Sequence, residues 1–115
     1  MKIEIKNPPR KFKVGSSQQI EISDCGSIYL NPDEQVTFIT KTGKRHDFAA
    51  KSWGFYVTPS VNDRVKNEGF KTALVRNQFG KHYVMVVEVE KVKEFQDYLQ
   101  AEQNTVVEWI DERSN

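Results

Sequence analysis

The chain has 115 residues, of which 37% are hydrophobic and 29% charged, with a formal net charge of +1. This length suits one domain, and the composition excludes a wholly disordered chain. No run approaches the roughly 18 consecutive apolar residues of a membrane helix, and the opening "MKIEIKNPPRKFKVG" alternates charges where a signal peptide would be apolar. We therefore expect a single globular domain over 1–115, located in the cytoplasm and without a membrane partner.

The first third of the chain predicts short strands separated by loops. "KIEIK" alternates as a strand that is buried on one side, with Ile3 and Ile5 on the same face. Two prolines, a glycine and two serines predict a flexible loop over 7–19. "QIEIS" and "SIYL" then read as two strands separated by a turn at "DCG".

Residues 35–48, "QVTFITKTGKRHDF", predict a β-hairpin. A three-residue loop that ends in a left-handed glycine sets Phe38 opposite His46 and Val36 opposite Phe48. This register places His46 on an apolar face. It also directs His46 and the adjacent Asp47 to opposite faces, so the two side chains cannot pair with each other.

Residues 53–57 predict a strand that leads into a short helix over 59–67. Alternation puts Trp53 inward with its apolar neighbours and leaves Tyr56 exposed. Thr58 or Ser60 supplies the helix cap, and Gly69 suits the left-handed stop.

The last third predicts a second hairpin, an amphipathic helix over 90–103 and a final strand, "TVVEWI". In the hairpin, a three-residue turn pairs Val75 with Tyr83 and Arg76 with His82. Because both hairpin faces are largely apolar, we expect it to be central and covered on both sides. The fold class is therefore α+β, a β-rich single domain with a largely antiparallel sheet of about seven short strands.

The composition and motifs of the chain limit the kinds of chemical site that it can contain. Cys25 has no partner for an internal disulfide, and we expect it to be an incidental thiol rather than a nucleophile. No phosphate-binding glycine loop, nucleophile elbow or metal-ligand spacing occurs, so we predict neither a cofactor nor a metal site. Asp111 and Glu112 near the C-terminus are expected to be solvated.

Charge is unevenly distributed along the chain. Residues 1–82 carry 14 Lys and Arg against 8 Asp and Glu, whereas residues 83–115 carry 3 against 8. One interpretation is a polarised surface that attracts an anionic partner. We favour the other, in which the two charged parts face each other within the fold.

The leading hypothesis from the sequence is a non-enzymatic binding or accessory module for a polar or anionic small molecule or for a partner protein. Trp53 or Tyr56 would offer a flat stacking surface, and Arg64, Arg76 and His82 would bind the charge.

Three further possibilities stay open. An enzyme acting on a sugar or nucleotide derivative would use His46 or His82 as its general base, with Asp63 or Arg64 in support. Nucleic-acid binding through the basic first 82 residues is less favoured. A homodimer could form through an edge strand, either "KIEIK" or "TVVEWI". Neither the ligand nor the reaction follows from the sequence.

Overall fold

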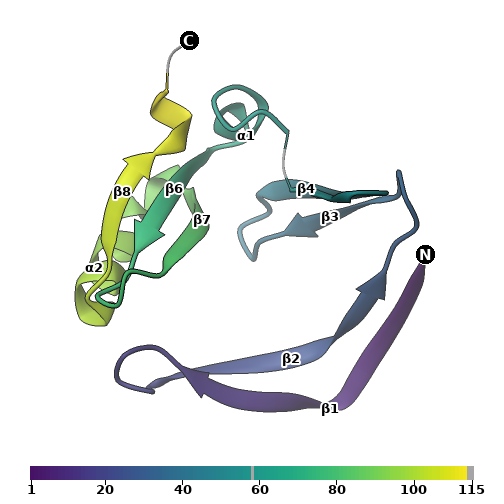
Figure 1. Ribbon diagram of the computed structural model, residues 1–115, viewed down its shortest axis with the longest axis horizontal. Coiled ribbons are helices and arrows are strands. Elements are labelled where there is room, and N and C mark those ends of the chain that lie inside the picture. Colours follow the sequence, from purple (N-terminus) through teal and green to yellow (C-terminus); the bar gives the residue numbers. More distant parts are fainter. Residues whose placement is uncertain (58, 114–115) are drawn as a thin grey trace.

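The computed structural model describes residues 1–57 and 59–113 and confirms the predicted β-rich α+β class (Figure 1). Eight strands, one more than expected, form three antiparallel sheets of two, three and three strands. The strands are β1 (Lys2–Val14), β2 (Ile20–Tyr29), β3 (Gln35–Ile39), β4 (Arg45–Lys51), β5 (Gly54–Tyr56), β6 (Phe70–Arg76), β7 (His82–Glu88) and β8 (Thr105–Trp109). The helices are α1 (Arg64–Asn67) and α2 (Val92–Glu102), with 3₁₀ turns at Val89–Lys91 and Ile110–Glu112. No helix in these two ranges is long and apolar enough to cross a membrane.

The first two strands form a long ribbon. The prediction of a flexible loop over 7–19 is therefore wrong. β1 continues to Val14, and only residues 15–19 form the turn to β2. The regular pairing of β1 with β2 is interrupted between Ile5 and Arg10. Both prolines of the segment lie inside this interruption, so their missing N–H groups remove no ladder hydrogen bond.

The turn expected at "DCG" is also absent, because β2 runs through it as one strand. Gly26 permits this with a φ of +145°, a conformation that L side chains rarely adopt. A Cβ atom at this position would lie 2.1 Å from the carbonyl oxygen of Glu4. The glycine therefore allows the backbones of β1 and β2 to approach closely, and it does not form a chain reversal.

The second sheet, in the order β3-β4-β5, confirms the predicted register of the 35–48 hairpin. Phe38 pairs with His46, and Val36 pairs with Phe48. The expected inward position of Trp53 is wrong. Residues 52 and 53 form the turn between β4 and β5, because Lys51 pairs with Gly54. Trp53 is 71% exposed, and Tyr56 is exposed as predicted.

The short helix expected over 59–67 is limited to the single turn of α1, preceded by an irregular segment. Ser60 contributes to its start, since its Oγ accepts the N–H of Arg64 at 3.1 Å, whereas Thr58 lies outside the described residues. Val65 is the buried residue of α1 and packs towards β6.

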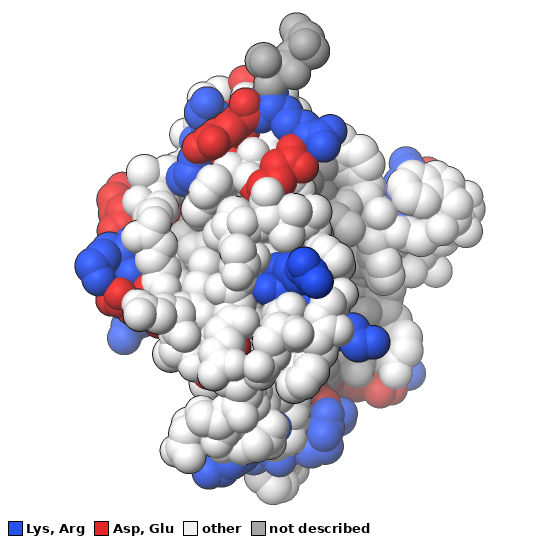
Figure 2. Space-filling model, turned by 60° about the vertical axis from the view of Figure 1, so that its left-hand side comes forward, with Lys and Arg blue, Asp and Glu red and all other residues white. Residues whose placement is uncertain are grey.

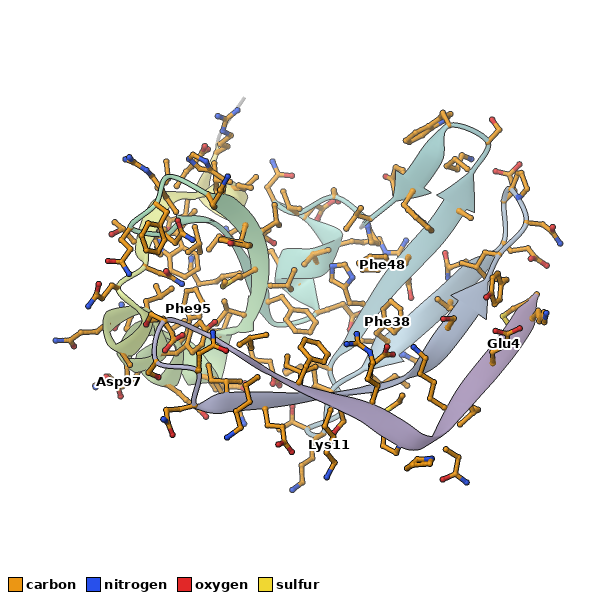
Figure 3. All side chains as sticks on the ribbon, turned by 60° about the horizontal axis from the view of Figure 1, so that its bottom comes forward. Glu4, Lys11, Phe38, Phe48, Phe95 and Asp97 are labelled. Carbon is orange, nitrogen blue, oxygen red and sulfur yellow. The ribbon has the colours of Figure 1, made fainter. Side chains whose placement is uncertain are left out.

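The third sheet, in the order β7-β6-β8, confirms the pairs Val75 with Tyr83 and Arg76 with His82. The hairpin is not central as a whole, because β7 is an edge strand and Val84 is 62% exposed. Helix α2 covers one face of the sheet. The main hydrophobic core forms there from Ala73, Val75 and Leu99, with Met85, Phe95, Val106 and Trp109 packed around them. Phe95 is labelled in Figure 3.

The charged segment near the C-terminus is not fully solvated. Asp111 is 2% exposed and accepts the backbone N–H of Thr72 at 2.8 Å and the ammonium of Lys71 at 3.0 Å. Lys71 also binds Glu112, and Lys44 lies 3.8 Å from Glu90. These pairs join the basic first part of the chain to its acidic last part. In Figure 2, acidic and basic side chains adjoin at the upper end of the face shown, beside a broad area with few charges.

Candidate functional site

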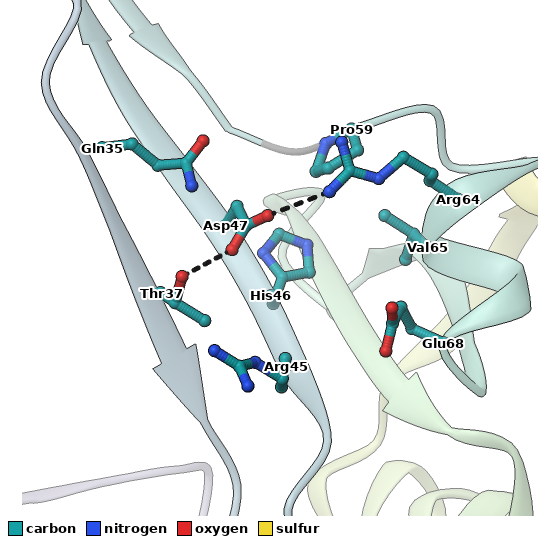
Figure 4. A pocket seen from close by; sticks show the side chains of 9 residues that line it. All are labelled: Gln35, Thr37, Arg45, His46, Asp47, Pro59, Arg64, Val65 and Glu68. Carbon is teal, nitrogen blue, oxygen red and sulfur yellow. Dashed lines mark hydrogen bonds and ion pairs between the residues drawn. The ribbon is translucent and has the colours of Figure 1, made fainter.

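A polar cleft lies where β4 meets α1 (Figure 4). β5 pairs with β4 only over Ala49–Lys51, so the preceding part of β4, Arg45–Asp47, has no strand on that side. The irregular segment before α1 and the helix itself lie along this open part and form the second wall. The cleft has a volume of about 310 Å³ and is lined by Gln35, Thr37, Arg45, His46, Asp47, Pro59, Arg64, Val65 and Glu68.

Asp47 connects the two walls of the cleft. The hydroxyl of Thr37, its cross-strand neighbour, donates to the Asp47 carboxylate at 2.7 Å. From the other wall, Nη2 of Arg64 donates to the same carboxylate at 3.3 Å (Figure 4). Since the Arg64 side chain is 70% exposed, this ion pair adds little to stability. It orients the guanidinium at the mouth of the cleft.

A second hollow of about 300 Å³ adjoins the cleft and brings in Tyr56. The two hollows share Gln35, Asp47, Pro59 and Arg64. Tyr56 comes from β5 and Arg64 from α1. The fold therefore places these two sequence-predicted site residues beside a common space.

The charges around the cleft are mixed. Arg45 and Arg64 face it together with Asp47 and Glu68. Arg64 and Asp47 bind each other, whereas Arg45 and Glu68 make no ion pair within residues 1–57 and 59–113. The guanidinium of Arg45 is thus available for a carboxylate or a phosphate, the anions that arginine binds with two parallel hydrogen bonds.

His46 lies at the base of the cleft and is only 8% exposed. Its ring lies 5.3 Å from that of Phe48 and 6.1 Å from that of Phe70, measured between centroids. Both ring nitrogens are buried without a hydrogen-bond partner among the described residues. Burial lowers the pKa of His46, and the nearby Asp47 carboxylate only partly opposes this effect. The imidazole is therefore held neutral.

The remaining sequence-predicted residues lie elsewhere. Arg76 and His82 are cross-strand partners at the turn end of β6 and β7, and they line neither hollow. Trp53 lies at the turn between β4 and β5. Asp63 accepts a hydrogen bond from Asn67 at 3.0 Å. The five proposed ligand-binding residues thus do not share one surface. Tyr56 and Arg64 line a common hollow, whereas Arg76 and His82 lie together at another place in the fold.

Sequence reasoning missed Thr37, Arg45 and Glu68. The hairpin register, which was predicted correctly, already sets Thr37 opposite Asp47 and could have identified that pair. No pattern along the chain brings α1 to β4, so the contribution of Glu68 depends on the fold. Among the described residues, no three His, Cys, Asp or Glu side chains are grouped as metal ligands.

No family model, curated protein or solved structure shows significant similarity to this chain. What can be said of function rests on the geometry of the cleft and on the surfaces that the fold leaves open.

Proposed function

We propose that the chain is a non-enzymatic binding module for a polar small molecule that carries a carboxylate or phosphate group. The observation that supports this most strongly is the position of Arg64, which is oriented by Asp47 and lines both hollows, one together with Arg45 and the other together with Tyr56. An oriented guanidinium loses less side-chain freedom on binding than a free one, which favours affinity.

Each side chain has a part in the proposed complex. Arg45 from β4 and Arg64 from α1 both line the cleft, and either guanidinium can bind an anionic group through charge-assisted hydrogen bonds. Tyr56, which is 52% exposed, offers a flat ring against which a planar ligand can stack. Gln35 and Thr37 supply further polar groups along the wall formed by β3.

Binding is favoured over catalysis because neither candidate base is suitably placed. The ring nitrogens of His46 are shielded from solvent, and a general base must come within hydrogen-bond reach of the proton that it removes. His82 is exposed but lies away from the cleft, at the turn end of β7. Nucleic-acid binding has less support, because Lys71 and Lys44 of the basic part are engaged by carboxylates of the last third.

A cytoplasmic location is part of the proposal. It is supported by Cys25, which is a free and exposed thiol, since such thiols persist in reducing compartments.

The test is an NMR titration of the ¹⁵N-labelled protein with three probes: inorganic phosphate, citrate and adenosine monophosphate. We expect at least one probe to shift the amide signals of Thr37, Arg45, Asp47 and Arg64. Arg64→Gln should weaken that binding about tenfold or more, as expected for the loss of a charge-assisted hydrogen bond.

Arg76→Gln is the matched control, because Arg76 is also an exposed arginine but lies outside both hollows. Binding should be unchanged in this variant. Signal changes centred on Arg76 and His82 would instead place the anion site at the end of the β6-β7 hairpin. That result, or no change with any of the three probes, would refute the proposed cleft.

A further inference from the structure

The β1-β2 ribbon carries apolar side chains that the other described parts of the chain leave largely exposed. None of its strand residues is buried. Ile3 pairs with Ile28 on one face of the ribbon, and the two residues are 54% and 44% exposed. Ile5, on the same face, is 74% exposed. A ribbon of two strands is at best marginally stable in water, and three or more strands are needed for independent stability.

The total surface of the chain is large for its size. The solvent-accessible surface is 8428 Å² for 13.4 kDa. A compact monomer of this mass exposes roughly 6,500 Å². The radius of gyration, 15.7 Å, exceeds the roughly 13 Å of a compact domain of this length. The surplus of roughly 1,900 Å² is more than the roughly 800 Å² that each partner buries in a standard interface.

Within residues 1–57 and 59–113 no strand pairs with the outer edge of β1, since the sheet contains only β1 and β2 there. Figure 1 shows β1 along the rim of the molecule, and Figure 3 shows Glu4 near the N-terminal end of that strand. Pro8 and Pro9 lack N–H groups and interrupt this edge, so regular pairing that includes Ile3 and Ile5 is confined to residues 1–7. Such an edge is a template for another strand.

We propose that two copies of this chain pair through β1 in an antiparallel arrangement, with Ile3 opposite Ile3 of the second copy. The pairing joins the two ribbons into one four-stranded sheet in the order β2-β1-β1-β2. This supplies the strands that the isolated ribbon lacks.

The sequence of β1 is self-complementary in this register. Met1 lies opposite Ile5 of the second copy, and Lys2 lies opposite Glu4, so apolar residues meet apolar ones and opposite charges meet. In the monomer, Lys2 and Glu4 lie 2.9 Å apart, with side chains 68% and 50% exposed. Both can therefore change partners without leaving a buried charge behind.

Neighbouring registers lack this complementarity. A two-fold axis at Glu4 sets the two Glu4 carboxylates opposite each other and Lys2 opposite Lys6, and like charges in such positions are unfavourable. An axis at Ile5 sets Ile3 opposite Asn7. The other candidate edge, β8, is also not self-complementary, because pairing centred on Val107 sets Val106 opposite Glu108.

Charge-swap variants of the full chain test the proposal by analytical ultracentrifugation over a range of concentrations. The wild type should reach twice the mass of 13.4 kDa. Lys2→Glu and Glu4→Lys should each raise the dimer dissociation constant roughly tenfold or more, because each places two pairs of like charges across the interface. An equimolar mixture of the two variants should recover the wild-type dissociation constant, because each chain then opposes the charges of the other.

Lys11→Glu is the control, since Lys11 belongs to the same strand but lies beyond the prolines. It should dimerise as the wild type does, and circular dichroism should show that all variants are folded. A monomeric wild type at every concentration would overturn the proposal and would leave the ribbon to a different partner. Single variants that dimerise normally, or a mixture that does not recover, would exclude the Ile3-centred register.

Discussion

The carboxylate of Asp111 and the ammonium of Lys71 lie 3.0 Å apart, although 40 positions separate the two residues in the chain. Burial alone would raise the pKa of Asp111. The N–H of Thr72 and the ammonium of Lys71 outweigh burial and hold that pKa below its ordinary value. The pair fastens the segment after β8 to β6.

Asp111→Asn should lower the free energy of unfolding by about 1–3 kcal/mol at pH 7, because it removes the charge that both donors bind. In the wild type this contribution is fully present above the unfolded-state pKa of about 4 and is lost as the pH falls through the lower folded-state value. Urea unfolding of both proteins between pH 7 and pH 3 measures the effect, and the two stabilities should converge in acid.

Glu112→Gln is the control for this prediction. Glu112 binds the same ammonium at 3.1 Å, but its side chain is 60% exposed. The substitution should change stability by less than about 1 kcal/mol. Equal losses in both variants would contradict the role assigned to burial.

His46→Phe should raise the free energy of unfolding by about 1 kcal/mol, because it removes two buried nitrogens without partners from an aromatic environment. The lowered pKa of His46 means that the unfolded chain takes up a proton near pH 6.5, whereas the folded chain does so only at lower pH. Wild-type stability should therefore decline from pH 7.5 to pH 5.5.

The stability of His46→Phe should decline less between pH 7.5 and pH 5.5 than that of the wild type, because the contribution of His46 is absent. Chemical unfolding at these two pH values measures the difference. His82→Phe serves as the comparison, since it replaces an exposed histidine by the same side chain. A less stable His46→Phe protein with the wild-type pH dependence would show that the imidazole is better accommodated than its surroundings indicate.

Gly26→Ala should destabilise the protein by more than the roughly 1–3 kcal/mol of backbone strain, because the new Cβ would also collide with the Glu4 carbonyl. Gly54→Ala is the control that measures the effect of backbone strain alone. Gly54 has almost the same φ, +144°, but among the described residues no atom beyond its two chain neighbours lies within 4 Å of its Cβ position. Thermal unfolding of the two variants should rank Gly26→Ala as clearly less stable, and equal losses would argue against the collision.

Glu102→Ala should release the turn of the ribbon from the end of α2. Glu102 accepts the N–H of Ser16 at 2.8 Å, although 86 positions separate them. Hydrogen exchange of the Ser16 amide should become faster while the amide of the core residue Val75 keeps its protection. Glu102→Gln retains an acceptor oxygen and should show a smaller change. Unaltered exchange at Ser16 in the alanine variant would contradict this anchoring role.

The two hairpins show what could be predicted of the fold. The pairs Phe38 with His46 and Val75 with Tyr83 follow from loop length and alternation, and the structure has both. The ribbon was harder to predict. Its prolines and glycine are typical of loops, and only the partner strand shows that they lie where the ladder is interrupted or where two backbones come close.

The candidate site, like the fold, could be predicted only in part. Tyr56 was expected to be exposed and Arg64 to lie within the predicted short helix over 59–67, and both expectations are local. Their meeting beside Asp47 required the path of the chain between β5 and α1. Arg76 and His82 are neighbours as predicted, yet they lie away from the cleft because they occupy the far end of a different sheet.

The amino-acid sequence by itself determined the β-rich class, the hairpin registers and the amphipathic helix, because these depend on interactions between residues close in the chain. The tertiary structure alone decided that Asp111 is buried, that Trp53 and the ribbon are exposed, and that Tyr56 and Arg64 share a hollow. Burial depends on contacts between segments that are distant in the chain. An alternating pattern predicts which face of a strand is apolar, but it does not predict which segment packs against that face.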